Sequence, residues 1–180
     1  MSDATPFRAT HAGRSYEQLR PLPVTVLLDN VRSLYNVGAF FRTVDGAGAE
    51  RLILGGITGR PPHKSIEKTA LGAQEAVAWE HHWDPLRRLD ELREGGYEIA
   101  AVETAAHAVD LFDWEPQFPV CLVFGNEVEG IREEILGKCD TFVRIPMLGT
   151  KQSLNVAVAG GVALYELLRK YRRLSENAGK

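Results

Sequence analysis

The sequence predicts an α/β protein with one mostly parallel sheet and helices on both of its faces. Strand-like apolar runs alternate with helix-like segments along the chain, the pattern of parallel sheets whose strands are joined by helices. The chain has 180 residues, 44% of them hydrophobic and 25% charged, which suits one domain with a sizeable core. It contains no internal repeat and no low-complexity linker.

The first half of the chain is expected to hold five elements. Apolar runs bounded by turn residues predict the strands, and apolar residues at helical spacing predict the helices. Gly46 and Gly48 lie where the first helix should end. In order, the elements are a strand over 24–28, a helix over 37–47, a strand over 51–54, a short helix over 64–71 and a strand over 77–81.

Six more elements are expected in the second half. Pro85 opens the first helix, Pro146 stops the last strand because proline has no ladder N–H, and Ser153 is the expected N-cap of the last helix. In order, the elements are a helix over 85–94, strands over 97–102 and 120–124, a short helix over 131–136, a strand over 141–145 and a long helix over 153–174.

One domain over 21–175 is expected, with an N-terminal arm over 1–20 and a short tail over 176–180. No apolar run approaches membrane-spanning length, and the first residues lack the apolar region of a signal peptide. The two cysteines, Cys121 and Cys139, have no CxxC spacing, so we expect reduced thiols and a cytoplasmic protein.

Neither a metal site nor a common nucleotide-binding loop is predicted. His81, His82 and Asp84 are close in sequence, but no further residue lies at ligand spacing from them. Gly46-x-Gly48 follows a helix rather than a strand, which does not fit a dinucleotide-binding turn.

Charge is distributed unevenly along the chain. Residues 71–140 carry sixteen Asp or Glu against five Lys or Arg, whereas 1–70 and 141–180 are both net positive. A polyanion such as RNA would therefore meet the two ends of the chain and avoid its middle. Undirected drift of surface charge explains the same distribution, so both interpretations stay open at this point.

The segment 144–161, RIPMLGTKQSLNVAVAGG, is the most informative stretch of the chain. It places a polar loop, Ser153 and Asn155 between the carboxyl end of a strand and the amino end of a helix. Open α/β sheets bind ligands at this place, and a helix start offers free N–H groups. An ordinary strand–loop–helix joint with a capping serine explains the pattern equally well.

The segment 28–42, LDNVRSLYNVGAFFR, leaves the first strand and enters a helix that Asn36 is expected to open. Helical side chains lean toward the amino end, so Arg42 should reach back over Gly38 toward Asn36. This would create a cationic spot beside exposed backbone. A helix whose arginine is simply solvated is the alternative.

The segment 119–134, PVCLVFGNEVEGIREE, contains an apolar strand that ends abruptly in Gly125-Asn126-Glu127. Glycine at the carboxyl end of a strand permits the close approach of a ligand. Glu127 is a candidate for orienting a substrate or another polar group. A simple turn would also explain these three residues.

Together and in this order, the three segments resemble the SpoU/TrmH family of RNA ribose methyltransferases, part of the SPOUT superfamily. The resemblance spans residue 24 to about residue 168. Val128 stands where the family often has Gly, and Ala157 where it often has Ser; both affect loop shape rather than a polar group. The motifs that carry the resemblance are Asn36-x-Gly38-x3-Arg42, Gly125-Asn126-Glu127 with Gly130, and Ile145-Pro146-Met147 with Ser153-Leu154-Asn155-Val156.

The resemblance implies a SPOUT-type sheet whose C-terminal part is tied in a trefoil knot, with the knot loops holding S-adenosylmethionine in a bent pose. No metal is implied, because the sulfonium methyl is already activated and alignment supplies much of the rest. The cofactor-binding residues that it implies are Thr104, Gly125, Asn126, Gly130, Ile145, Met147, Ser153 and Leu154.

The reaction implied by the resemblance is methyl transfer to a ribose 2′-oxygen, with Arg42 in the central role. Because a guanidinium does not ordinarily lose a proton, we expect Arg42 to bind the adjacent phosphate and stabilise the developing alkoxide. Action as a base assisted by that phosphate stays open. The residues implied to position the ribose and support Arg42 are Asn36, Glu127, Ser153 and Asn155.

The resemblance also implies a homodimer whose site is completed across the interface, and RNA as the partner. An apolar stripe on the last helix is a plausible dimer surface, although core packing explains it equally well. We expect tRNA rather than rRNA, because only about twenty residues precede the first strand. A non-catalytic relative and a SPOUT base methyltransferase remain alternatives. The stripe consists of Val158, Val162, Tyr165 and Leu168.

Overall fold

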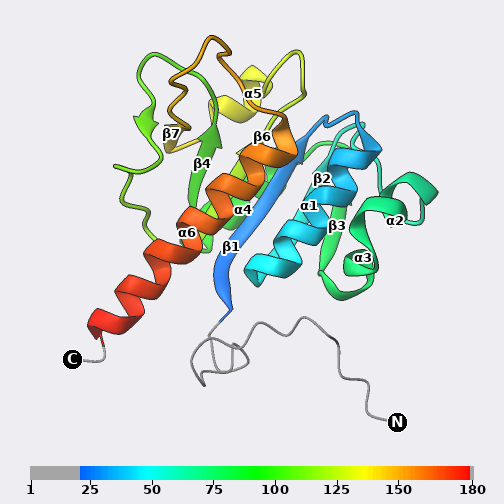
Figure 1. The fold of residues 1–180 in the computed structure, drawn as a ribbon, viewed down its shortest axis with the longest axis horizontal. Coiled ribbons are helices and arrows are strands. Elements are labelled where there is room, and N and C mark those ends of the chain that lie inside the picture. Colours follow the sequence, from blue (N-terminus) through cyan, green and yellow to red (C-terminus); the bar gives the residue numbers. More distant parts are fainter. Residues whose placement is uncertain (1–20, 179–180) are drawn as a thin grey trace.

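The computed structural model describes residues 21–178, with the side chains of the last helix described to residue 174. Seven strands form one sheet in the order β3-β2-β1-β6-β4-β7-β5, and every pairing is parallel (Figure 1). The predicted α/β class is confirmed. The strands are β1 (Leu22–Asp29), β2 (Ala49–Gly55), β3 (Trp79–His82), β4 (Glu98–Val102), β5 (Val109–Asp110), β6 (Val120–Phe124) and β7 (Thr141–Arg144).

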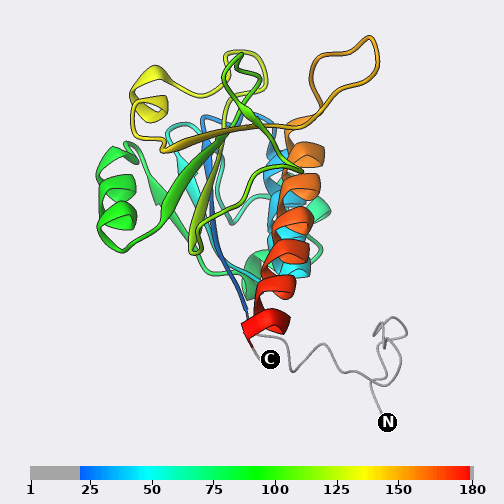
Figure 2. The ribbon, with the colours of Figure 1, turned by 90° about the vertical axis from the view of Figure 1, so that its left-hand side faces the viewer.

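Helices cover both faces of the sheet, as expected. Figure 2 shows α4 and α5 on one side of the sheet and α1 and α6 on the other. The described helices are α1 (Leu34–Ala47), α2 (Lys64–Ala70), α3 (Ala73–Ala76), α4 (Leu86–Glu94), α5 (Glu133–Leu136) and α6 (Val156–Ala178).

Two buried clusters follow from the alternation of side chains along the strands. In β1, Val26 and Leu28 belong to the cluster beneath α1, α2 and α6, whereas Leu27 belongs to the cluster beneath α4 and α5. In β6, Leu122 and Val123 divide in the same way. The central strands β1 and β6 therefore bury side chains on both faces of the sheet, and they pair in parallel from Val24 with Val120 to Leu28 with Phe124.

Most predicted elements are confirmed within a few residues, and the differences lie at helix starts and in short elements. Helix α1 begins at Leu34, because the Ser33 side chain caps it by accepting from the Asn36 N–H at 3.3 Å. Asn36 is thus in the first turn rather than at the opening of the helix. Its predicted end is correct, since Gly48 adopts a left-handed conformation with φ of 67°. The elements α3 and β5 are absent from the sequence prediction.

The predicted cap of the last helix is wrong. Helix α6 begins at Val156, and the Asn155 side chain caps it by accepting from the N–H groups of Ala157 at 2.9 Å and Val158 at 3.3 Å. Asparagine caps a helix as well as serine does, so Ser153 is left in the preceding loop. The helix also runs to Ala178, through residues expected to form a tail.

The apolar stripe predicted on the last helix divides between the core and the surface. Val162 and Leu168 pack against the main core, whereas Val158 and Tyr165 are each 53% exposed. The strand order agrees with the knotted C-terminal part implied by the family, and the threading itself stays a prediction. The predicted arm over 1–20 lies outside the described residues.

Both cysteine thiols are free. Burial raises the pKa of Cys121 far above its ordinary value, and burial together with the nearby Asp140 raises the pKa of Cys139 to about 12. Neither thiol is therefore ionised at neutral pH, and both behave as packing groups. No described helix is long and apolar enough to cross a membrane.

Contact between α6 and α1 depends on Gly160, and this yields a stability prediction. A Cβ at Gly160 would lie 2.2 Å from Cε1 of the buried Phe40 ring, whereas a Cβ at the adjacent Gly161 would lie 4.0 Å from Thr43. We expect Gly160→Ala to lower the free energy of unfolding by about 1–3 kcal/mol through overpacking. Gly161→Ala should not lower it, because alanine favours helix over glycine by about 1 kcal/mol. Urea unfolding of both variants measures the difference, and equal effects would contradict this packing.

Candidate functional site

A cavity of about 280 Å³ lies at the carboxyl edge of the sheet, between the loops that follow β4, β6 and β7 and the start of α6. This is the edge at which parallel α/β sheets bind ligands. Its volume is near the lower end of the range for small-molecule sites. All eight residues predicted for the cofactor line it, namely Thr104, Gly125, Asn126, Gly130, Ile145, Met147, Ser153 and Leu154.

Glu127 joins this cavity to the amino end of α1. One carboxylate oxygen accepts from the Ser33 N–H at 3.1 Å and from the Asn36 side-chain amide at 2.9 Å, and the other accepts from the Arg32 N–H at 3.1 Å. These donors include N–H groups that the helix start leaves without a helical partner. Although burial opposes ionisation, the hydrogen bonds from Asn36 and from the backbone hold the pKa of Glu127 below its ordinary value.

Asn36 extends the contact to the third segment. Its side-chain oxygen accepts from the Asn155 amide at 3.2 Å, while the Asn155 oxygen caps α6. Glu127, Asn36 and Asn155 therefore form one chain of hydrogen bonds that joins the loop after β6 to the starts of α1 and α6. The three segments that the sequence singled out meet at this chain.

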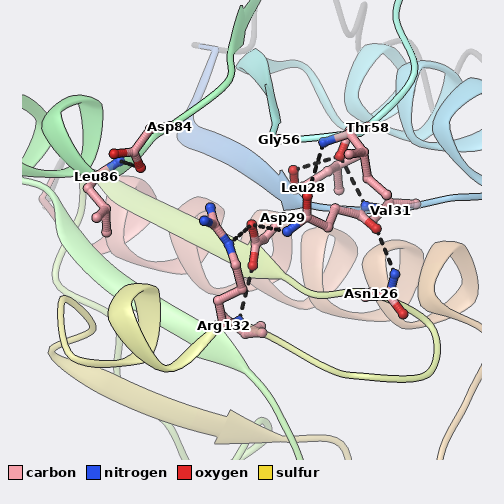
Figure 3. A network of polar contacts seen from close by, with 12 residues as sticks. Leu28, Asp29, Val31, Gly56, Thr58, Asp84, Leu86, Asn126 and Arg132 are labelled. Carbon is pink, nitrogen blue, oxygen red and sulfur yellow. Dashed lines mark hydrogen bonds and ion pairs between the residues drawn. The ribbon is translucent and has the colours of Figure 1, made fainter.

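An ion pair between a fully buried carboxylate and a partly exposed arginine holds the loop that carries Glu127. Asp29, fully buried at the end of β1, accepts from Arg132 through the side-chain Nε at 2.9 Å and the backbone N–H at 3.1 Å (Figure 3). Asn126, 8% exposed, donates to the Asn30 carbonyl at 2.9 Å. Because the Asp29 side chain is fully buried while that of Arg132 is 36% exposed, loss of Arg132 would leave a buried carboxylate without its cationic partner, so the pair fixes the loop. The sequence analysis missed Asp29 and Arg132, because their pairing joins residues that are far apart in the chain.

Close packing against the backbone of a neighbouring turn requires glycine at position 125. A Cβ at this position would lie 2.2 Å from the carbonyl carbon of Gly130 and 2.3 Å from the Ile131 nitrogen. The glycine lets the turn between Asn126 and Gly130 fold back on the end of β6, where the two residues exchange backbone hydrogen bonds at 2.9 and 3.0 Å. Gly125 also lines the cavity, so the expectation that it permits the close approach of a ligand stays a prediction beside this structural role.

The expected surroundings of Arg42 are also wrong. Gly38 is buried against α2, where a Cβ would lie 2.0 Å from Thr69 Oγ1 and 2.4 Å from the Ile66 carbonyl oxygen, so it exposes no backbone beside Arg42. Arg42 itself is exposed, does not line the cavity, and makes no hydrogen bond or ion pair with another described residue. Within one chain, Arg42 and the cavity are therefore separate features.

Several residues of the cavity wall escaped the sequence analysis. Glu103 directly follows β4 and accepts from the Thr104 N–H at 3.0 Å and more weakly, at 3.4 Å, from the Ile131 N–H. Its position directly after a predicted strand could have marked Glu103 as a candidate site residue, because parallel sheets bind ligands at the carboxyl ends of their strands. Phe124 supplies an apolar wall, and Arg144 and Gln152 supply polar ones. In the described part of the chain, no group of three metal-ligating side chains comes together.

Comparison with known proteins agrees with the order of the three segments. The model of the SpoU rRNA Methylase family matches residues 23–165. The chain belongs to this family. A 23S rRNA (guanosine-2′-O-)-methyltransferase, RlmB, from Ralstonia nicotianae is 36% identical over 82% of this chain and 59% of its own length. The chain spans 59% to 66% of the length of the curated relatives that it matches first.

Solved structures of the SpoU family share the fold. The A. aeolicus TrmH/SpoU tRNA modifying enzyme has a TM-score of 0.78 and 33% identity, covering 87% of this chain and 79% of its own. An AdoMet-bound rRNA methyltransferase from Sinorhizobium meliloti has a TM-score of 0.76 and 31% identity, covering 83% of this chain and 60% of its own. The parallel sheet of this chain is thus the sheet of the SpoU methyltransferases.

The Glu127 contact predicts a pH-dependent contribution to stability. Because the folded-state pKa lies below the ordinary value of 4.5, the ionised carboxylate stabilises the fold above about pH 4.5. This contribution is lost as the pH falls through the folded-state pKa. We expect Glu127→Gln to lower the free energy of unfolding at about pH 7 and to have little effect at about pH 3.

Urea unfolding of the wild-type chain and of Glu127→Gln at the two pH values measures this difference. Glu129→Gln is the matched control, since Glu129 is exposed in the same loop and its side chain makes no hydrogen bond with a described residue. An effect of Glu127→Gln that is independent of pH would contradict the assigned role of the ionised carboxylate.

Proposed function

We propose that this chain is an S-adenosylmethionine-dependent RNA methyltransferase that acts on a ribose 2′-oxygen. The observation that carries the proposal is the hydrogen-bonded chain Glu127–Asn36–Asn155, which joins all three family segments beside a cavity. The names of related proteins support it: one relative is a guanosine-2′-O-methyltransferase, and one structural neighbour is an RNA 2′-O ribose methyltransferase.

The cavity suits an amphipathic cofactor of this kind. The loops at Thr104, at 125–130 and at 145–154 surround it with backbone groups, and Phe124 gives it an apolar wall. The Glu103 carboxylate accepts only from neighbouring N–H groups and the Thr104 hydroxyl among the described residues, so it retains acceptor capacity for a hydroxyl-bearing or cationic ligand. When bound, S-adenosylmethionine supplies an activated methyl group on a positively charged sulfur.

The transfer needs alignment and charge stabilisation rather than a metal. A bond forms between the ribose 2′-oxygen and the methyl carbon as the carbon–sulfur bond breaks, and the hydroxyl proton passes to the neighbouring RNA phosphate or to solvent. Because a guanidinium stays protonated, Arg42 binds that phosphate and stabilises the charge that develops on the 2′-oxygen. Asn36, Glu127, Ser153 and Asn155 hold the ribose beside it.

A homodimer explains how Arg42 reaches the reaction. Arg42 lies outside the cavity of its own chain, and its position six residues after Asn36 corresponds to about 9 Å along the helix axis. The half-exposed Val158 and Tyr165 on α6 provide an apolar surface for a second copy. In this arrangement, Arg42 of one subunit serves the cavity of the other.

The proposed substrate is RNA, and within this class we propose tRNA rather than rRNA. One structural neighbour is named as a tRNA modifying enzyme and one relative as a 23S rRNA methyltransferase, so the family includes both. The preference for tRNA and the cytoplasmic location stay predictions. The two free, un-ionised thiols support the location.

Arg42→Ala is expected to lower methyl transfer by at least about 100-fold, because removal of one group that stabilises developing charge typically costs this much. The affinity for S-adenosylmethionine should be nearly unchanged, since Arg42 does not line the cavity of its own chain and its proposed contact in the other subunit is with the RNA phosphate rather than with the cofactor. Incorporation of labelled methyl groups into RNA and calorimetric titration of the cofactor measure the two effects.

Arg87→Ala is the matched control, because the Arg87 side chain is 91% exposed on α4, on the opposite face of the sheet. Activity that survives Arg42→Ala would contradict the assigned role of Arg42. Cofactor binding by the wild-type chain without transfer to any RNA pool would instead favour a non-catalytic relative.

Binding of RNA should weaken steeply as salt is raised. Each phosphate neutralised by Lys or Arg releases counterions, so the logarithm of the affinity falls linearly with the logarithm of the salt concentration. Filter binding of bulk tRNA over a range of salt concentrations measures the slope. An affinity that does not change with salt would contradict an RNA substrate.

A further inference from the structure

A second cluster of side chains lies on the same edge of the sheet as the cavity, and the proposed reaction does not use it. Trp83 directly follows β3 and is 71% exposed, an unusual state for so large an apolar side chain. It neighbours His81 and His82, the histidines for which the sequence offers no metal partner.

His81 is held rigidly between Trp83 and Arg60. Its Nδ1 lies 2.9 Å from Arg60 Nη1, and its Nε2 lies 3.0 Å from the Gly56 carbonyl oxygen. Because arginine has only donors, Nδ1 must accept, and Nε2 therefore carries the proton that is donated to Gly56. The two hydrogen bonds thus fix the ring at both nitrogens.

The fixed imidazole supports the indole. The ring centroids of His81 and Trp83 are 5.0 Å apart with an interplanar angle of 87°, an edge-to-face contact. Asp84, the nearest acidic neighbour in sequence, is engaged elsewhere, since its carboxylate accepts from the Leu86 N–H at the start of α4 (Figure 3). The result is an exposed indole whose supporting imidazole also contacts the Arg60 guanidinium.

This cluster is connected to the proposed site. The Ile57 N–H in the loop after β2 donates to the Asn30 side chain at 3.0 Å, and Asn126 donates to the Asn30 carbonyl at 2.9 Å. Thr58 ties the same loop to β1 by donating to the Leu28 carbonyl and accepting from the Val31 N–H. Since β3, β2 and β1 are adjacent strands about 4.8 Å apart, the ends of β3 and β1 lie about 10 Å apart.

We propose that Trp83, supported by His81 and flanked by Arg60, is a stacking platform for an unpaired base of the RNA, close to the nucleotide that is methylated. Every base has a π-face, and stacking on an aromatic side chain contributes about 1–3 kcal/mol per base. The exposed Arg32 in the loop after β1 and the exposed Lys64 at the start of α2 add positive charge of the kind that suits a phosphate backbone. This inference rests on the proposed function, because it takes RNA as the substrate.

Stacking requires unpaired bases, and this defines the experiment. The probes are a fluorescein-labelled RNA hairpin with an unpaired loop and a blunt RNA duplex with the same stem. We expect Trp83→Ala to weaken binding of the hairpin about 5- to 150-fold, the fold-change that corresponds to loss of one stacked base, and to leave binding of the duplex unchanged. Trp83→Phe should retain most of the affinity, because phenylalanine still offers an aromatic face.

Phe112→Ala is the matched control. Phe112 is also an aromatic side chain and is 57% exposed. It follows β5, and β5 and β3 are the two outermost strands of the sheet, on opposite sides. The Phe112→Ala variant should bind the hairpin with the same affinity as the wild-type chain. Calorimetric titration of S-adenosylmethionine and the thermal midpoint verify that each variant is folded.

Tryptophan fluorescence provides a second readout that does not depend on Trp83→Ala. Quenching on addition of the hairpin should occur in the wild-type chain and be largely lost in Trp83→Phe, since Trp114 is buried and Trp79, which is 36% exposed, lies at the other end of β3. Wild-type affinity of Trp83→Ala, an equal loss for hairpin and duplex, or unchanged quenching in Trp83→Phe would each overturn the inference. A wild-type chain that binds neither the cofactor nor RNA would instead refute the proposed function.

Discussion

The contact between the Glu127 carboxylate and the amino end of α1 holds the candidate site together. Two backbone N–H groups and the Asn36 amide converge on this carboxylate, and Asn36 in turn contacts Asn155 at the start of α6. One ionised side chain therefore places three loops from distant parts of the chain. The same hydrogen bonds hold the pKa of Glu127 below its ordinary value.

The parallel sheet makes that contact possible. In a parallel sheet all carboxyl ends lie at one edge, so the loops after β1, β4, β6 and β7 are neighbours even though they are far apart in sequence. The Asp29–Arg132 pair fixes the loop after β6 against β1. The loop after β2 and Trp83, which follows β3, lie at the same carboxyl edge of the sheet, where we propose that the RNA binds.

The sequence predicts those features that depend on local pattern. The alternation of strands and helices follows from apolar periodicity, and the residues of the three segments are recognisable because each lies at the end of a strand or the start of a helix. The family resemblance supplies the order of these segments, and all eight residues assigned to the cofactor line one cavity.

Features that depend on tertiary contacts are not predictable in this way. Ser33 and Asn36 can both cap a helix, and so can Ser153 and Asn155; in each pair the choice depends on partners elsewhere in the fold. The role of Gly38 depends on the close crossing of α1 with α2, which no local pattern reveals. Arg42 lies outside the cavity of its own chain, and no local pattern predicts this placement.

Identification of the methylated atom tests the central claim most directly. RNA from a strain that lacks this protein would be incubated with the purified chain and S-adenosylmethionine carrying an isotopically labelled methyl group, then digested to nucleosides and analysed by mass spectrometry. The account predicts that the label appears in a 2′-O-methylnucleoside, with the label on the sugar fragment. Label on a base would contradict the account, because a site built to hold a ribose hydroxyl beside Arg42 would then be performing a different reaction.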